Sequence, residues 1–187
     1  MALALVREDN WGDPVSCEAF QLCGPACLYQ FQKLRNCWHL VQAAEASRGR
    51  PFDWLIRIRP DTVWRAPIGN LSDFDASVVH LVMGVNKGDP EDNFALVPRQ
   101  HGEAYFAIGE GCPTAQETQK AGCAIPWYEG AHINPECALF TRLAKFGVPI
   151  APFPKIYQIK REEVCRPDDP RGCGQCSRGV CRYDYSL

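Results

Sequence analysis

Residues 52–61 read Phe-Asp-Trp-Leu-Ile-Arg-Ile-Arg-Pro-Asp, an apolar and aromatic run that ends in a charged turn. This pattern predicts a short buried strand that stops at Pro60. Before it, apolar residues recur at three- and four-residue steps through residues 28–47 and predict an amphipathic helix that Gly49 ends. After it, the apolar run of residues 78–85 predicts a second buried strand.

Further along the chain, residues 94–97 predict a third short strand, and a helical stretch with Ala104, Tyr105 and Phe106 follows. Residues 109–130 show no period and predict a long surface loop. Asn134-Pro135-Glu136 predicts the start of a helix that Gly147 ends, and residues 148–159 predict one edge strand. This alternation predicts an α/β fold in which helices flank a layered sheet.

The composition is that of a globular protein, with 46% hydrophobic and 22% charged residues in 187. It excludes a collagen, a coiled coil and a chain disordered throughout. The net charge of -2 provides no field that would attract nucleic acid, so we expect no nucleic-acid partner. The apolar residues 1–6 give way to charge at Arg7, and no run reaches the length of a membrane span, so we expect no membrane segment.

Cysteine is unusually frequent, with 11 residues clustered towards the two ends of the chain. Such clustering favours disulfides in an oxidising compartment, and the single sequon Asn70-Leu71-Ser72 agrees with a lumenal address. Because no targeting segment is visible, two interpretations stay open. The protein is cytosolic with reduced thiols, or the chain is the later part of a longer precursor, which is the interpretation we favour.

From residue 162 the chain becomes charged, Gly-rich and Cys-rich, which predicts a tail outside the core. We therefore expect three segments: a Cys-containing N-terminal segment at 1–27, an α/β domain at 28–161 and the tail at 162–187. Four tail thiols are candidates for two disulfides. A Zn site is the less favoured alternative, because such sites are typical of two Cys-x2-Cys motifs and the tail does not have a pair of them. The four thiols are those of Cys165, Cys173, Cys176 and Cys181.

Arg59 and Asp61 are the first candidates for a binding site, because polar residues beyond the carboxyl end of a strand often line one. An aspartate there binds a divalent cation through hard oxygen, and an arginine grips a diphosphate with its planar fork. The alternative is an ion pair between the two side chains that merely closes the turn.

The same stretch resembles a pattern in GT-A-like glycosyltransferase domains of plants and algae. Three further segments occur in the same order: the helix around residues 30–45, the Asp-x-Phe-Ala segment that begins at Asp92, and the Pro-Glu helix that begins at Pro135. The closing strand at residues 157–161 is also similar, so the resemblance covers about residues 28–161. The family's metal motif has two aspartates one residue apart, whereas Thr62 and Val63 follow Asp61, and no nucleotide-binding strand is recognised before residue 28.

The resemblance implies a partial GT-A-like sheet, a nucleotide-sugar donor, a glycan or protein acceptor, and an address in the Golgi lumen or secretory pathway. It implies that Asp61 holds Mn or Mg, or the donor ribose, and that Arg59 neutralises the leaving diphosphate. Asp92 or Glu136 would take the acceptor proton. Two alternatives are simpler: Glu136 serves the helix dipole, and Asp92 lies in a solvated turn. The alternative function is a non-catalytic Cys-rich binding or scaffold protein with a degenerate glycosyltransferase fold.

Overall fold

The computed structural model describes residues 25–83, 90–108, 113–121, 135–159, 162–164, 176–177 and 180–182. These residues belong to two compact units, each described by itself below. The first comprises Met1–Arg57 and Asp75–Phe153, and the second comprises Ile58–Phe74 and Pro154–Leu187. The predicted boundary before residue 162 falls within the second unit.

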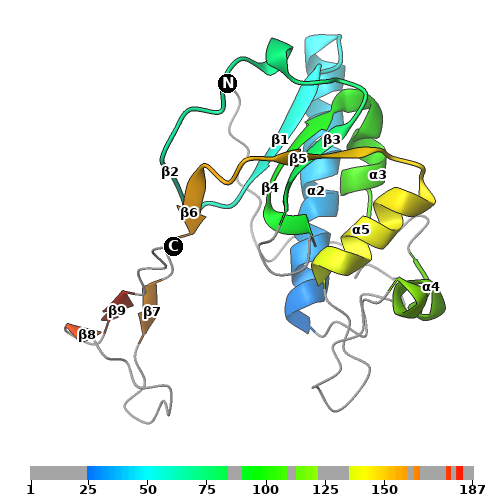
Figure 1. Ribbon diagram of the computed structural model, residues 1–187. Helices are drawn as coiled ribbons and strands as arrows, with labels where there is room; N and C mark the ends of the chain where they lie inside the picture. The colour runs from blue at the N-terminus through cyan, green and yellow to red at the C-terminus, as the bar shows by residue number, and fades with distance from the viewer. Residues whose placement is uncertain are drawn as a thin grey trace. The chain divides into compact units, whose positions relative to one another are not determined.

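The first unit is a mixed α/β structure built on a four-stranded sheet with the order β1-β4-β3-β5 (Figure 1). Its strands are β1 (Trp54–Ile58), β3 (Val79–Met83), β4 (Pro90–Pro98) and β5 (Ile150–Phe153). β3 pairs antiparallel with β4 and parallel with β5, so the sheet is mixed. The α/β class expected from the sequence is therefore confirmed.

Helix α2 (Pro25–Arg48) confirms the predicted first helix and ends at Gly49, whose φ of +70° suits glycine. Phe31, Leu34 and Trp38 are its buried stripe, at the spacing of one helix face. Its last turn is tied to the end of β4, because Glu45 accepts two hydrogen bonds from Arg99, at 2.6 and 2.7 Å. The Phe52 amide donates to the same carboxylate at 2.9 Å.

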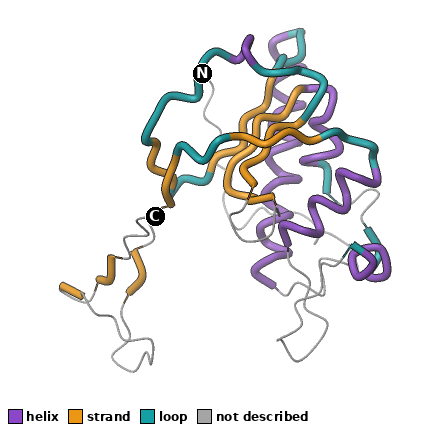
Figure 2. The backbone as a smooth tube through the Cα atoms, viewed as in Figure 1, coloured by secondary structure: helices purple, strands orange, loops and turns teal. Residues whose placement is uncertain are grey.

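Among the described residues, the other helices of this unit are α3 (Gly102–Phe106), α4 (Ala115–Lys120) and α5 (Pro135–Lys145), as the backbone trace shows (Figure 2). α3 and α5 confirm the predicted helices. The buried Arg142 of α5 donates to the carbonyls of Ala104 and Ala107 at 2.8 and 2.9 Å, which binds α5 to the end of α3. A short 3-10 turn, η3 (Arg99–His101), also lies in this unit, and another, η2 (Leu71–Asp73), lies in the second unit.

The surface loop predicted for residues 109–130 is wrong where α4 forms, and residues 109–112 and 122–130 lie outside the described residues. α4 begins with a capping box. The Glu117 carboxylate accepts from the Thr114 amide at 2.7 Å, and the Glu117 amide donates to the Thr114 hydroxyl at 3.2 Å. These two bonds satisfy backbone donors that would otherwise be unpaired, so a helix of only six residues is stable here.

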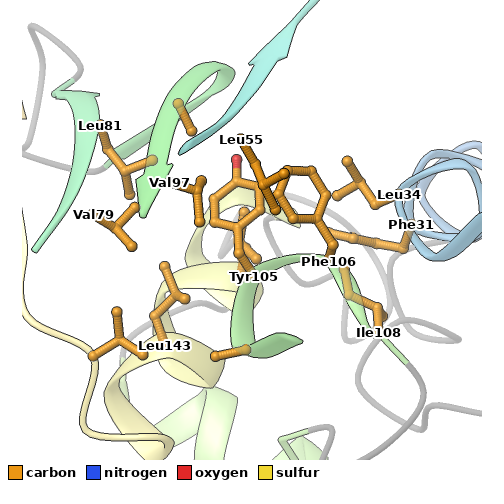
Figure 3. Packing of buried hydrophobic residues seen from close by; sticks show 14 of the residues in the cluster. Phe31, Leu34, Leu55, Val79, Leu81, Val97, Tyr105, Phe106, Ile108 and Leu143 are labelled. Carbon is orange, nitrogen blue, oxygen red and sulfur yellow. The ribbon is translucent and has the colours of Figure 1, made fainter. Parts of the chain in front are cut away.

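One hydrophobic cluster joins α2, the sheet, α3 and α5 (Figure 3). Alternate residues of β3 and β4 enter it, as the twofold period of a strand requires. Gly102 is needed where α3 meets α2 and β1, because a Cβ there would lie 2.7 Å from a Trp38 ring atom and 2.9 Å from Leu55. The members of the hydrophobic cluster that Figure 3 labels are Phe31, Leu34, Leu55, Val79, Leu81, Val97, Tyr105, Phe106, Ile108 and Leu143.

The prediction that β1 is a buried strand is wrong. β1 lies at one edge of the sheet, where Leu55 is buried but Ile56 and Ile58 are 42% and 47% exposed. The prediction is confirmed for β3, where Val79 to Val82 are all buried. Position in the sheet explains the difference, because a central strand has neighbours on both sides and an edge strand does not.

In the second unit, β2 (Thr62–Trp64) pairs antiparallel with β6 (Tyr157–Ile159). The prediction of one edge strand over residues 148–159 is confirmed in β5, which lies at an edge of its sheet, but it missed β6, which belongs to a different sheet. Trp64 packs on Tyr157 with ring centroids 5.6 Å apart. Farther along, β7 (Glu162–Val164), β8 (Cys176–Ser177) and β9 (Val180–Arg182) form a small sheet of their own.

No described helix combines the length and the apolar character that a membrane span requires. Of the described cysteines on helices, Cys37 of α2 is a free thiol, whereas Cys137 of α5 is disulfide-bonded. Burial raises the pKa of the Cys37 thiol, and the charge of Arg57 opposes that rise.

Candidate functional site

Arg59 and Asp61 lie in the turn between β1 and β2, within the second unit. The Thr62 amide donates to the Arg59 carbonyl at 3.2 Å and closes this turn. The Arg59 Nε and Nη2 donate to the two carboxylate oxygens of Asp61, at 2.9 and 2.8 Å. The two predicted residues are thus together in a bidentate ion pair, which is the contact proposed by the simpler interpretation of this turn.

The pair is accessible, since its two side chains are 31% and 29% exposed. The carboxylate holds the guanidinium plane in one orientation, which lowers the conformational entropy lost when an anion binds its outer edge. Next to the pair, the Thr62 hydroxyl is buried and has no hydrogen-bond partner among the described residues. A buried hydroxyl without a partner costs free energy.

A shallow hollow of about 480 Å³ lies in the same unit, lined by Ile58 and by the consecutive residues 64–68. Its lining combines the Trp64 ring, the Arg65 guanidinium and apolar side chains. Such a surface suits a ligand with one flat or apolar face and one anionic group.

Asp92 lies on β4 in the first unit and is only 6% exposed, so the solvated-turn interpretation is wrong. Its Oδ2 accepts a hydrogen bond from Arg57 Nη2 at 3.2 Å, and Arg57 Nη1 donates to the Tyr105 hydroxyl at 3.2 Å. Arg57 comes from β1 and Tyr105 from α3, so one guanidinium joins three elements. The Asp92 carboxylate is thus engaged by Arg57 in a buried network. Its role as proton acceptor stays a prediction.

The electrostatics of the network favour a charged Arg57. Burial works to lower the pKa of Arg57, but Tyr105 and Asp92 more than offset it, and the pKa ends above its ordinary value. Burial raises the pKa of Tyr105, while Arg57 opposes that rise. Figure 3 shows the Tyr105 ring within the hydrophobic cluster and its hydroxyl oxygen directed towards Leu55. The network therefore provides polar contacts at the border of an apolar core.

Glu136 is the second residue of α5 and its side chain is half-buried. An acid in the first turn stabilises the positive end of the helix, so the position agrees with the dipole interpretation. Its catalytic role stays a prediction. Of the predicted site residues, Asp92 and Glu136 belong to the first unit and Arg59 and Asp61 to the second.

Two of the tail cysteines predicted for disulfides or Zn, Cys165 and Cys173, lie outside the described residues. The other two, Cys176 and Cys181, are Cα partners in the antiparallel pairing of β8 with β9. Opposite residues of antiparallel strands have Cα atoms at a separation that a disulfide spans. Both the disulfide and the Zn interpretation of the tail stay predictions.

The Mn or Mg ion that the resemblance implies would require several donor side chains close together. Among the described residues, no three His, Cys, Asp or Glu side chains gather into a set that would hold a metal. Asp61 supplies one carboxylate, which Arg59 already engages. The Mn or Mg ion therefore stays a prediction.

Sequence reasoning missed the network of Arg57, Asp92 and Tyr105. One signal was present, because Arg57 stands between Ile56 and Ile58 in an otherwise apolar strand, and a charged residue there requires a partner when its face is buried. The partner was not identifiable from spacing, since Asp92 lies 35 residues away.

No family model, curated protein or solved structure matches this chain.

Proposed function

We propose that the chain is a glycosyltransferase-like protein in which Arg59 binds the diphosphate of a nucleotide-sugar donor. The supporting observation is the bidentate Arg59–Asp61 pair, which presents an oriented and partly exposed guanidinium. In the proposed reaction the oxygen of an acceptor hydroxyl on a glycan or protein forms a bond to the anomeric carbon, and the hydroxyl proton passes to water. The bond from that carbon to the diphosphate breaks, and Arg59 neutralises the negative charge that develops on the leaving group.

Asp61 has a second part in this proposal as the residue that positions Arg59. Its carboxylate also suits the hydroxyls of a ribose, which are hydrogen-bond donors. The Thr62 hydroxyl, which has no partner among the described residues, supports the same turn as the binding site, because a phosphate oxygen would accept a hydrogen bond from it. A partial GT-A-like fold and an address in the Golgi lumen or secretory pathway belong to the proposal. The disulfide at Cys137 supports an oxidising compartment.

Isothermal titration of the full chain with UDP- and GDP-sugars tests the proposal. We expect binding, and we expect Arg59→Ala to weaken it about tenfold or more, the value of a charge-assisted hydrogen bond. Arg59→Lys should weaken it less, because lysine keeps the charge but loses the planar fork. Titrations with Mn and with a chelator measure any contribution of a divalent cation.

Two matched controls separate this turn from general charge effects. Asp73→Ala removes an exposed carboxylate of the same unit, and Arg50→Ala removes an exposed guanidinium elsewhere, so both should leave binding unchanged. If Asp61→Ala leaves both binding and sugar transfer unchanged, Asp61 has no part in the site.

A non-catalytic binding or scaffold protein is the second candidate function. The observation that favours it is that Asp61 and Asp92 are each engaged by an arginine of the chain itself. Absence of binding to every sugar nucleotide, with Mn and without it, would support this function over the first.

A further inference from the structure

We infer that Asn70 is a site of N-linked glycosylation, a modification that goes beyond the proposed function and involves none of its residues. Asn70, Leu71 and Ser72 form the chain's single Asn-x-Ser/Thr triplet, and the middle residue is not proline. Such triplets are common in sequences, so the exposure and the backbone conformation of residues 70–72 carry the inference.

The triplet lies in the long connection between β2 and β3, outside both sheets, where Asn70 and Ser72 are exposed. Asn70 precedes the short turn η2 with extended backbone angles, and its side chain makes no capping hydrogen bond. The amide group that would carry a glycan is therefore not used to hold the turn.

The space around Asn70 is open on the side of the preceding residue. Gly69 has a φ of +95°, and a Cβ added there would meet nothing within 4 Å. After the triplet, Asp73 is also exposed, and the Ser72 hydroxyl donates to its carboxylate over a long 3.5 Å. A bulky and hydrophilic glycan at this position would extend from exposed residues.

The local backbone is also easily opened. The turn is held by two backbone bonds, from the Asp73 amide to Asn70 at 3.0 Å and from the Phe74 amide to Leu71 at 3.3 Å. Such a short 3-10 turn is less stable than a helix or a paired strand, so the triplet can adapt to a transferase. The disulfide at Cys137 is expected in the oxidising lumen in which this modification takes place.

The reaction joins Asn70 to a lipid-diphosphate-linked oligosaccharide. The Asn70 amide nitrogen forms a bond to the anomeric carbon and loses a proton. The bond from that carbon to the diphosphate oxygen breaks, and the lipid diphosphate leaves with the electron pair.

The test is translation of the full chain, with a cleavable signal sequence, into eukaryotic microsomes, followed by peptide N-glycosidase. We expect a protease-protected product that carries one glycan, which the glycosidase removes while converting the asparagine to aspartic acid. Asn70→Gln and Ser72→Ala should each abolish the glycan, and Ser72→Thr should retain it. Asn36→Gln, at a helical position outside any triplet, is the matched control and should change nothing.

A protease-protected wild-type chain without a glycan would overturn the inference, as would a glycan that survives Asn70→Gln. The secreted fraction is analysed separately, because it shows whether the folded protein carries the glycan. A glycan confined to retained chains and missing from the secreted, disulfide-bonded protein would also contradict it. Sugar-nucleotide binding is not part of this test, so its failure and that of the proposed function are distinguishable.

Discussion

Two Arg–Asp pairs begin only two residues apart in the sequence and have opposite surroundings. Arg57 and Asp92 lie on neighbouring strands of the first unit, with side chains 9% and 7% exposed. Arg59 and Asp61 share one turn of the second unit, and their side chains are 31% and 29% exposed. The first pair joins β1, β4 and α3, whereas the contact between Arg59 and Asp61 lies within one turn.

The difference shows that burial, rather than the kind of residue, decides how much an ion pair contributes to stability. A buried charge that loses its partner has no water to replace it, so the Arg57–Asp92 pair is needed for stability. An exposed pair contributes little to stability because water competes for both groups. Because Arg59 and Asp61 are partly exposed, a ligand can reach them in the proposed function.

The largest expected effect comes from removing one member of the buried pair. Asp92→Ala leaves Arg57 charged and without its carboxylate, and should lower the free energy of unfolding by about 3–5 kcal/mol. Urea unfolding of the full chain measures it. In the double variant Arg57→Met, Asp92→Ala the charge is gone, so the loss should be smaller than in Asp92→Ala alone. A loss below about 1 kcal/mol for Asp92→Ala would place this pair with the surface pairs.

An intermediate effect is expected for Glu45, whose partner Arg99 is 30% exposed while the Glu45 side chain is 10% exposed. Glu45→Ala removes the acceptor of the Arg99 guanidinium and of the Phe52 amide, and should cost about 1–2 kcal/mol. The same urea experiment tests the order of the two variants. If Glu45→Ala lowered the free energy of unfolding more than Asp92→Ala, burial would not determine the order of the two effects.

The stability contributed by Glu45 should depend on pH in the acid range. The hydrogen bond from Arg99 is the main cause that holds the pKa of Glu45 below its ordinary value of 4.5. The unfolded chain therefore takes up the proton first, so this contribution is present above 4.5 and is lost as the pH falls further. Free energies of unfolding measured across this range should fall less steeply in Glu45→Gln. Equal slopes in the two proteins would show that Glu45 does not contribute to the acid dependence.

The smallest stability effect is expected at the exposed pair. Asp61→Ala should lower the free energy of unfolding by less than about 1 kcal/mol, because Arg59 stays hydrated. If the proposed function holds, the same variant weakens nucleotide-sugar binding, so stability and binding separate at this residue. Thermal melts and titrations on one preparation measure both. A large destabilisation without a change in binding would reverse the assigned roles of the two pairs.

Much of the fold was predictable from local pattern. The helix that ends at Gly49 and the helix that ends at Gly147 follow from apolar periodicity and from glycines with positive φ. α4 was missed although Thr114 and Glu117 stand at capping-box spacing, because its sequence has no apolar period. For the candidate site, the pairing of Arg59 with Asp61 was an alternative that local spacing already contained.

The amino-acid sequence alone determined the features that depend on residues close together in the chain. These are the helices, the turn at Pro60, and the closeness of Arg59 to Asp61. Only the tertiary structure decided that β1 is an edge strand, that β5 and β6 join different sheets, and that Asp92 meets Arg57. The reason is that a helix period or a turn is set by contacts within a few residues. Strand order and the partner of a buried charge depend instead on which distant segments bury their apolar faces together.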